Sequence, residues 1–258
     1  MAKFQESEVK KTIRLLIKNA CEFLQRQELT YLGLPAENAT DIKVLNGLLK
    51  NVICIDEKKA TLEETRRSIA GMRLKERKFI VANMWEYLRD LYQNESLTAD
   101  IAFLDFYGGG IREDNPFAYE IAGLRNYFVK HAHQQNKAFV LAWTYMPRDK
   151  GIEPYQALDK ILSSEDVSFL QKTKGVQFRS VAIRLLLKQL IQEHTMSVKV
   201  VQHAVYKNVM NTIILIFSKG IDAKCEVTLE SPDSLLSEPC YVYKIDSLIP
   251  EPVSLFNI

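Results

Sequence analysis

Three polar positions follow apolar runs, and their residue types suit a nucleotide-like ligand. Asp56 and Glu57 end one run, Asn83 ends the next, and Asp105 ends a third, shortly before Gly108–Gly110. One carboxylate can accept hydrogen bonds from both hydroxyls of a ribose, each worth about 1.5–3 kcal/mol. An amide both donates and accepts. Three consecutive glycines lose much chain entropy on ordering, so a close approach or a loop motion must offset that cost.

Each position also has a structural interpretation. Asp56 is favoured as a ribose-binding acid, but a solvated acid that caps the following helix is the alternative. Asn83 fits equally well as a helix N-cap with Trp85 in the core, and the two roles are compatible. The loop after Asp105 could also be a flexible glycine loop on a fold that has lost its chemistry.

The elements that must position these residues follow a regular rhythm. The segment Glu6–Gln27 has apolar side chains every three or four residues, which predicts an amphipathic helix. Short apolar runs then alternate with helical stretches, and such repeated βαβ units predict a parallel sheet. The expected strands are Leu29–Leu34, Asn51–Ile55, Lys78–Asn83, Ile101–Phe106 and Ala138–Met146, and the helices between them are Asn38–Leu49, Ala60–Met72, Trp85–Tyr92 and Pro116–Gln134.

The pattern changes after the fifth strand. Helices are expected at Tyr155–Leu162 and Phe178–Glu193, then strands at Val198–Tyr206 and Thr212–Phe217, which must be antiparallel because so few residues join them. The fold class is therefore α/β: a doubly wound, seven-stranded, mostly parallel sheet with a C-terminal antiparallel hairpin and helices on both faces. We expect an N-terminal helix (1–28), one domain (29–220) and a C-terminal extension packed on it (221–258), in which Cys240–Ile245 could add an edge strand.

From about Leu29 to Gly220 the chain resembles the class I S-adenosylmethionine-dependent methyltransferases. The order of the elements and the strand ends carry the resemblance. It implies a Rossmann-like domain with S-adenosylmethionine as cofactor, bound beyond the carboxyl ends of the strands. The chain departs from the family pattern in its first loop, where Gly33 is the only glycine and Pro35 removes a backbone donor.

The resemblance assigns a role to each strand end. Gly33 and Glu37 would lie near the amino-acid end of the cofactor, although a first-turn acid such as Glu37 also favours a helix N-terminus. Asp56, with Glu57 second, would bind the ribose. Asn83 would bond the adenine amino group while Met84 or Trp85 packs on the ring.

The same resemblance places the chemistry after the fourth strand. Asp105 would accept a hydrogen bond or a proton from the nucleophile, and Tyr107 would pack on the substrate. Relatives that methylate amino groups carry prolines here, which this chain lacks. The acceptor is expected to be a nucleic acid or nucleotide, which a basic, aromatic edge could guide; its candidate residues are Trp143, Tyr145, Arg148, Lys150, Lys172, Lys174 and Arg179.

Two other classes remain open. The glycine-poor first loop and the missing prolines favour a non-catalytic fold that serves as an interaction module. A nicotinamide-dependent oxidoreductase is weaker, because the chain has no G-x-G-x-x-G loop. Neither a P-loop nor a nucleophile elbow is present, and His131 and His133 make a poor metal pair because they do not share a helix face; the C-terminus of a helix suits them better.

The bulk composition is that of an ordinary globular chain. The 258 residues include 34 basic and 32 acidic side chains, a formal charge of +2 that argues neither for nor against nucleic acid. The polar N-terminus, the absence of a long apolar run and four cysteines without metal-like spacing predict a cytoplasmic protein with reduced thiols. No metal is expected.

Overall fold

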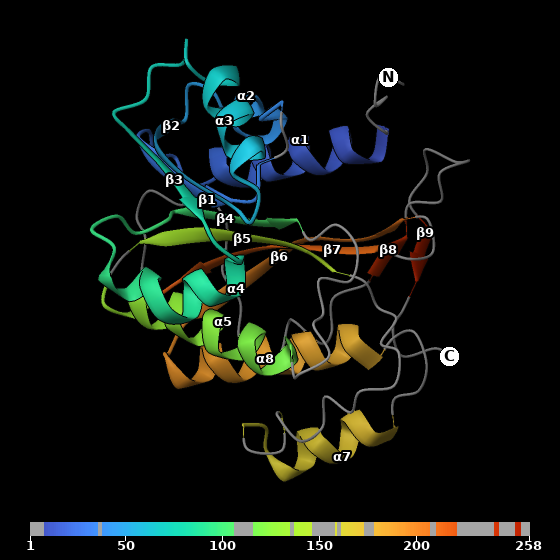
Figure 1. Cartoon of the computed structure of the whole chain (residues 1–258). Helices are drawn as coiled ribbons and strands as arrows, with labels where there is room; N and C mark the ends of the chain where they lie inside the picture. The colour runs from blue at the N-terminus through green and yellow to red at the C-terminus, as the bar shows by residue number, and fades with distance from the viewer. Residues whose placement is uncertain are drawn as a thin grey trace.

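The computed structural model describes residues 8–35, 38–105, 116–134, 137–145, 158, 161–172, 178–206, 210–220, 240–242 and 251–253. The strands form one sheet in the order β3-β2-β1-β4-β5-β7-β6-β8-β9 (Figure 1). They are β1 (Leu29–Gly33), β2 (Leu49–Asp56), β3 (Glu76–Val81), β4 (Ile101–Asp105), β5 (Ala138–Tyr145), β6 (Ser197–Tyr206), β7 (Met210–Ser218), β8 (Cys240–Val242) and β9 (Glu251–Val253).

The predicted fold class is confirmed. Strands β1 to β5 are parallel, and β7 runs antiparallel between β5 and β6. The strand order reverses between β1 and β4, which is the switch point of a doubly wound sheet. Strand β8 lies within the predicted segment Cys240–Ile245 and pairs with β6. Strand β9, which was not predicted, extends the sheet beyond the expected seven strands.

One face of the sheet is covered by α1 (Glu8–Glu22), α2 (Thr40–Val44) and α3 (Lys59–Ser68). The predicted amphipathic stripe of α1 is buried, with Ile13, Ile17 and Ala20 packed against strand residues of the same face. Burial of this stripe holds α1 across the sheet, and it therefore fixes the polar side chains on the same side of the helix.

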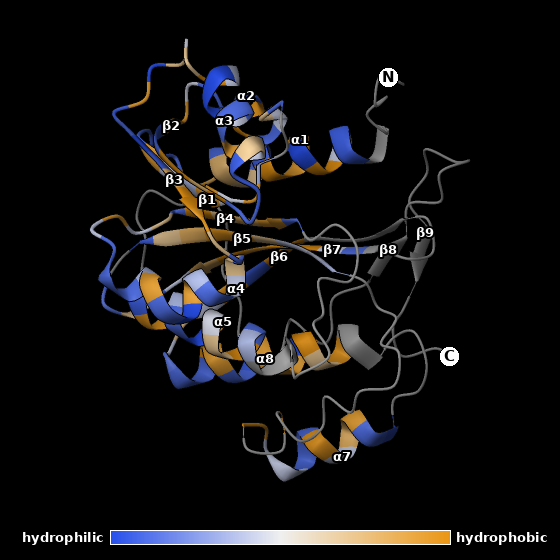
Figure 2. Ribbon diagram, in the orientation of Figure 1, coloured by the Kyte–Doolittle hydropathy of each residue, from blue (hydrophilic) through white to orange (hydrophobic). Residues whose placement is uncertain are grey.

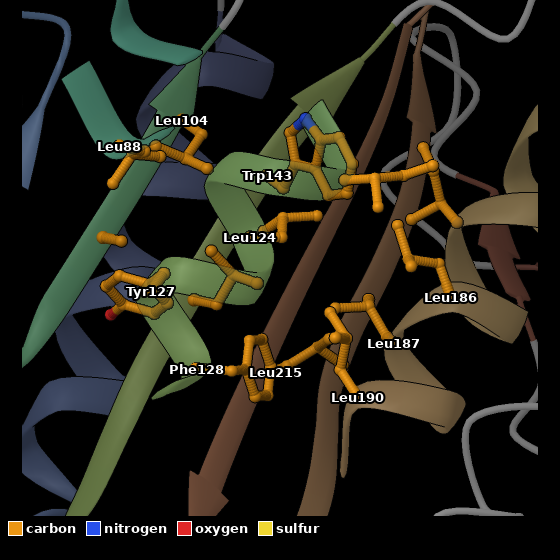
Figure 3. Close-up of a cluster of buried hydrophobic side chains, with 14 of the residues drawn as sticks. Leu88, Leu104, Leu124, Tyr127, Phe128, Trp143, Leu186, Leu187, Leu190 and Leu215 are labelled. Carbon is orange, nitrogen blue, oxygen red and sulfur yellow. The ribbon is translucent and has the colours of Figure 1, made fainter. Parts of the chain in front are cut away.

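The opposite face carries α4 (Met84–Glu86), which continues into a π-helix (Tyr87–Leu91) and a 3-10 turn (Tyr92–Asn94), together with α5 (Pro116–Ala132) and α8 (Phe178–Glu193). Figure 3 shows Phe128 of α5 beside Leu215 of β7 and Leu187 and Leu190 of α8, with Leu124 of α5 nearer to Trp143 of β5, all in one core cluster. The helix α7 (Ser164–Lys172) packs outside α8.

Several boundaries differ from the expectation. Helix α2 is shorter than the predicted Asn38–Leu49, because the chain turns at Gly47 with φ of +92°. Helix α7 was missed although Ser163 caps it by accepting a bond from the Asp166 amide. Of the predicted helix Tyr155–Leu162, only Leu158, Ile161 and Leu162 lie in the described ranges. None of the described helices has the length and apolar character that crossing a bilayer requires.

Candidate active site

The carboxyl ends of the parallel strands bring the predicted polar residues to one edge. Gly33 of β1 lies opposite Cys54 of β2 on one side and Phe103 of β4 on the other. Asp56 and Asp105 each lie two residues further along their strands, so they flank β1 at the same level. With strands spaced about 4.8 Å apart, the two backbones are roughly 10 Å apart. Because side chains alternate along a strand, both carboxylates belong to the face that α1 and α3 cover.

Asp56, Glu57 and Asn83 join the ends of β2 and β3. Asp56 Oδ1 accepts a hydrogen bond from the Lys58 amide at 2.7 Å, just before α3 begins. Asn83 Nδ2 donates to Glu57 Oε1 at 2.9 Å, and Asn83 Oδ1 accepts from the Trp85 amide at 2.9 Å. The N-cap alternative for Asn83 is therefore confirmed, whereas Asp56 bonds the amide of Lys58, the N-cap residue of α3, and does not itself cap that helix.

Met84 and Trp85 are core residues. Met84 is buried at the start of α4, and Trp85 packs edge-on against Trp143 with 5.5 Å between ring centroids. In this conformation neither offers an open surface to an adenine ring. The residue with an exposed apolar side chain at this edge is Val81, the last residue of β3, which is 56% exposed.

Gly33 is surrounded by the protein's own atoms. A Cβ at Gly33 would collide with the Tyr31 hydroxyl and would lie 2.9 Å from the Phe103 carbonyl oxygen. Tyr31 is fully buried, burial raises its pKa well above the usual range, and its hydroxyl has no hydrogen-bond partner among the described residues. The space freed by the missing side chain is thus filled by a buried hydroxyl without a partner.

Asp105 is paired with a residue of the N-terminal helix. Lys10 Nζ of α1 lies 2.9 Å from Asp105 Oδ2, and the side chains are 16% and 12% exposed. One helical turn further, Arg14 forms a buried ion pair with Asp41 of α2. Burial raises the pKa of Asp41, and the neighbouring Arg14 opposes this shift.

A small cavity of about 10 Å³ lies beside Asp105, lined by Lys10, Ile13, Arg14, Phe103, Asp105 and Thr144. The Thr144 hydroxyl is bonded to the Thr212 hydroxyl at 2.9 Å, which links β5 to β7 at this edge. Ligand sites for small molecules usually measure about 300–1,000 Å³. This cavity holds about one water molecule and is too small for a nucleotide in the described conformation.

Sequence reasoning missed Lys10, Arg14 and Tyr31. Lys10 lies three residues before the buried Ile13, and Arg14 lies three residues before the buried Ile17. The signal was therefore a pair of basic residues in register with the apolar stripe of α1. In the sequence, Tyr31 is one more member of the apolar run Leu29–Leu34. Its hydroxyl becomes notable only when the strand's neighbours are known.

Some expected residues lie outside the described ranges, namely Glu37, Tyr107, the glycines Gly108–Gly110, and Arg148, Lys150 and Lys174 of the predicted basic edge; Arg179 is described in its backbone alone. Within the described ranges, no three His, Cys, Asp or Glu side chains gather as a metal site. His131, expected to favour a helix C-terminus as a cation, is buried instead, and burial lowers its pKa to about 3.

No protein-family model matches the chain, and no curated protein matches it. Its structure is similar to solved structures at low sequence identity. An O-methyltransferase from Bacillus cereus in complex with SAH is 12% identical, with 84% of both chains covered and a TM-score of 0.46. The O-methyltransferase TomG from Streptomyces achromogenes in complex with SAM is 11% identical, with 85% of this chain and 84% of that chain covered and a TM-score of 0.47. An rRNA methylase from Streptococcus thermophilus is 12% identical, with 83% and 98% covered and a TM-score of 0.42.

Proposed function

We propose that this chain is an S-adenosylmethionine-dependent methyltransferase whose acceptor is a nucleic acid or nucleotide. The observation that carries the proposal is the pair Asp56 and Asp105, which flank β1 at the switch point of the sheet and share one face. Ligands of doubly wound sheets bind at this crevice. The resemblance of the strand ends to the methyltransferase superfamily gives the ligand its identity.

The residues at this edge fit the cofactor's functional groups. Asp56 keeps its second carboxylate oxygen free of bonds to described residues, so it can accept from the ribose hydroxyls, with Glu57 beside it. Asn83 can bond the adenine once it releases Glu57. The Tyr31 hydroxyl, which has no partner among the described residues, would have to leave its buried position beside Gly33 to serve the amino-acid end, and Glu37, where the resemblance puts it, would contribute there.

The bound cofactor supplies a methyl group on a sulfonium, and the protein supplies alignment and electrostatics. Asp105 accepts a hydrogen bond or a proton from the acceptor's nucleophilic atom. In the free protein Lys10 holds this carboxylate, so the acceptor must take over a contact that Lys10 makes. Tyr107 is proposed to pack on the acceptor.

Transfer of a labelled methyl group from S-adenosylmethionine into RNA, DNA or protein pools tests the proposal. We expect label in a nucleic-acid pool. Asp105→Asn should reduce transfer by at least about a hundredfold, the usual contribution of a positioned acid or base, without changing cofactor affinity. Label found in protein alone would refute the acceptor assignment, and label in no pool would refute the activity.

A second candidate is a non-catalytic interaction module on the same fold. Three contacts favour it: Tyr31 fills the space at Gly33, Lys10 occupies Asp105, and Asn83 occupies Glu57. Here we expect a stable complex with a partner chain that Asp105→Ala leaves intact. Measurable methyl transfer to any pool would exclude it.

A further inference from the structure

Seven exposed basic residues lie along the surface formed by α3, the loop after it and the start of β3. They are Lys58, Lys59, Arg66, Arg67, Arg73, Lys75 and Arg77, and we call this surface the α3–β3 strip. The segment Lys58–Arg77 is described throughout and contains three acids, Glu63, Glu64 and Glu76, a formal excess of four positive charges. The whole chain carries a formal charge of +2, so the remainder has an excess of acids.

The charges of the strip are largely uncompensated. Arg66 has an acidic partner, Glu63, at 3.6 Å on an exposed helix face, where such a pair contributes little. Arg77 donates to the Met72 carbonyl oxygen at 2.6 Å and keeps its charge. Lys59, Arg67 and Arg73 form no ion pair with a described acid, so their charges are available to a ligand.

The shape of the strip fits an extended strand of phosphates. It begins at Lys58 and Lys59, beside Asp56 at the carboxyl edge, and runs along α3 toward the loop before β3. Among the described strands, β3 pairs with β2 alone and forms the edge of the sheet. On this edge the Arg66 guanidinium lies 4.8 Å from the centre of the Phe79 ring. Basic groups next to an aromatic ring are typical of single-stranded nucleic-acid sites.

The chemistry of α3 argues against a membrane surface. A helix that lies on a bilayer needs an exposed apolar face. The apolar residues Leu62 and Ile69 of this segment are buried against the sheet, and Figure 2 colours most of α3 as hydrophilic.

We propose that the α3–β3 strip binds the phosphate backbone of a single-stranded nucleic acid and leads it to the carboxyl edge of the sheet. This inference rests on the proposed function in naming that strand as the methyl acceptor. The binding itself is independent of the chemistry, because no residue of the strip belongs to the proposed catalytic or cofactor site.

Fluorescence anisotropy with labelled single-stranded RNA and DNA of about 12 nucleotides, within the usual site size, tests the strip. We expect binding that weakens steeply with salt. Replacing Lys59, Arg67 and Arg73 together by Gln should weaken binding at least tenfold and reduce the log–log salt slope by about 2, at about 0.7 per lost phosphate contact. A matched variant with Lys11, Lys18 and Lys137 replaced by Gln has the same net charge, lies outside both the strip and the predicted basic edge, and should bind like the wild type.

An equal loss of affinity in both triple variants would overturn the proposed strip, because net charge alone would then explain binding. Unchanged affinity in both variants would overturn it as well. Binding to phosphatidylserine vesicles with none to nucleic acid would also overturn it. Calorimetric titration with S-adenosylmethionine separates the two proposals. Strip-dependent nucleic-acid binding without cofactor binding supports the strip and contradicts the methyltransferase, whereas cofactor binding without strip-dependent nucleic-acid binding does the reverse.

Discussion

At the scale of single residues, the site is defined by close contacts that sequence spacing does not reveal. Gly33 tolerates no side chain because the Tyr31 hydroxyl lies where a Cβ would point. Gly33→Ala should therefore lower the free energy of unfolding by about 1–3 kcal/mol, the usual cost of overpacking. Urea denaturation measures the change.

The control for this prediction is Tyr31→Phe, which removes the hydroxyl that has no partner among the described residues. Alone it should be neutral or slightly stabilising, because a buried hydroxyl without a partner carries an uncompensated desolvation cost. Added to Gly33→Ala, it should recover part of the lost stability, and two close contacts account for the rest: the Tyr31 ring carbon Cζ, which phenylalanine keeps and which lies 2.6 Å from the Cβ position, and the Phe103 carbonyl oxygen at 2.9 Å. No recovery would show that the hydroxyl is not the obstacle.

The ion pair between Lys10 and Asp105 gives a second prediction. Both side chains are largely buried, so Lys10→Met should leave an uncompensated charge and cost about 1–3 kcal/mol in unfolding free energy. Asp105→Asn should lower the unfolding free energy less in the Lys10→Met variant than in the wild type, because the two contacting residues are coupled by about 0.5–3 kcal/mol. Strict additivity in urea denaturation would mean that the pair does not form in solution.

At the scale of elements, α5 carries a buried histidine that makes stability depend on pH. His131 stacks on Phe139 at 3.8 Å between ring centroids, and burial lowers its pKa to about 3 from an ordinary value of 6.5. The unfolded chain therefore binds the proton more tightly than the folded chain does. The contribution of His131 to the unfolding free energy is therefore present in full well above pH 6.5, and it declines as the pH falls from about 6.5 toward 3.

Between pH 7.5 and pH 5.5 the wild type should lose about 1.4 kcal/mol of unfolding free energy through this residue. Over the same interval the unfolding free energy of His131→Leu should fall by about 1.4 kcal/mol less than that of the wild type, because the leucine side chain does not titrate. Urea denaturation of both proteins at the two pH values measures the difference. Parallel pH profiles would show that His131 is not the titrating group.

The elements themselves were largely predictable. The α8 bounds agree with the prediction, and strands β1 to β7 lie within a few residues of their apolar runs. The signal is strongest in β1, β2, β4 and β5, which are buried on both faces. Helix α7 and strand β9 were missed because α7 is stabilised by a cap and by packing on α8, and β9 by pairing with β8 alone. Such partners are distant in the sequence or contribute little hydrophobic pattern.

At the scale of the whole molecule, the sheet order explains how distant strand ends form one site. Asp56 and Asp105 are 49 positions apart in the sequence, yet each lies one strand away from Gly33. The polar strand ends were predictable because the carboxyl edge of a parallel sheet collects them. The contribution of α1 was not predictable, because the residue spacing does not indicate that Lys10 and Arg14 reach the same edge from the helix layer.

Calorimetric titration with S-adenosylmethionine measures whether this edge of the sheet binds the cofactor through Asp56. We predict saturable binding to the wild type and at least tenfold weaker binding to Asp56→Ala, since one charge-assisted bond is worth about 1.5–3 kcal/mol. Glu63→Gln, on the exposed face of α3, should bind like the wild type. Absence of binding to the folded wild type at millimolar cofactor, or equal affinity in the wild type and Asp56→Ala, would contradict cofactor binding through Asp56.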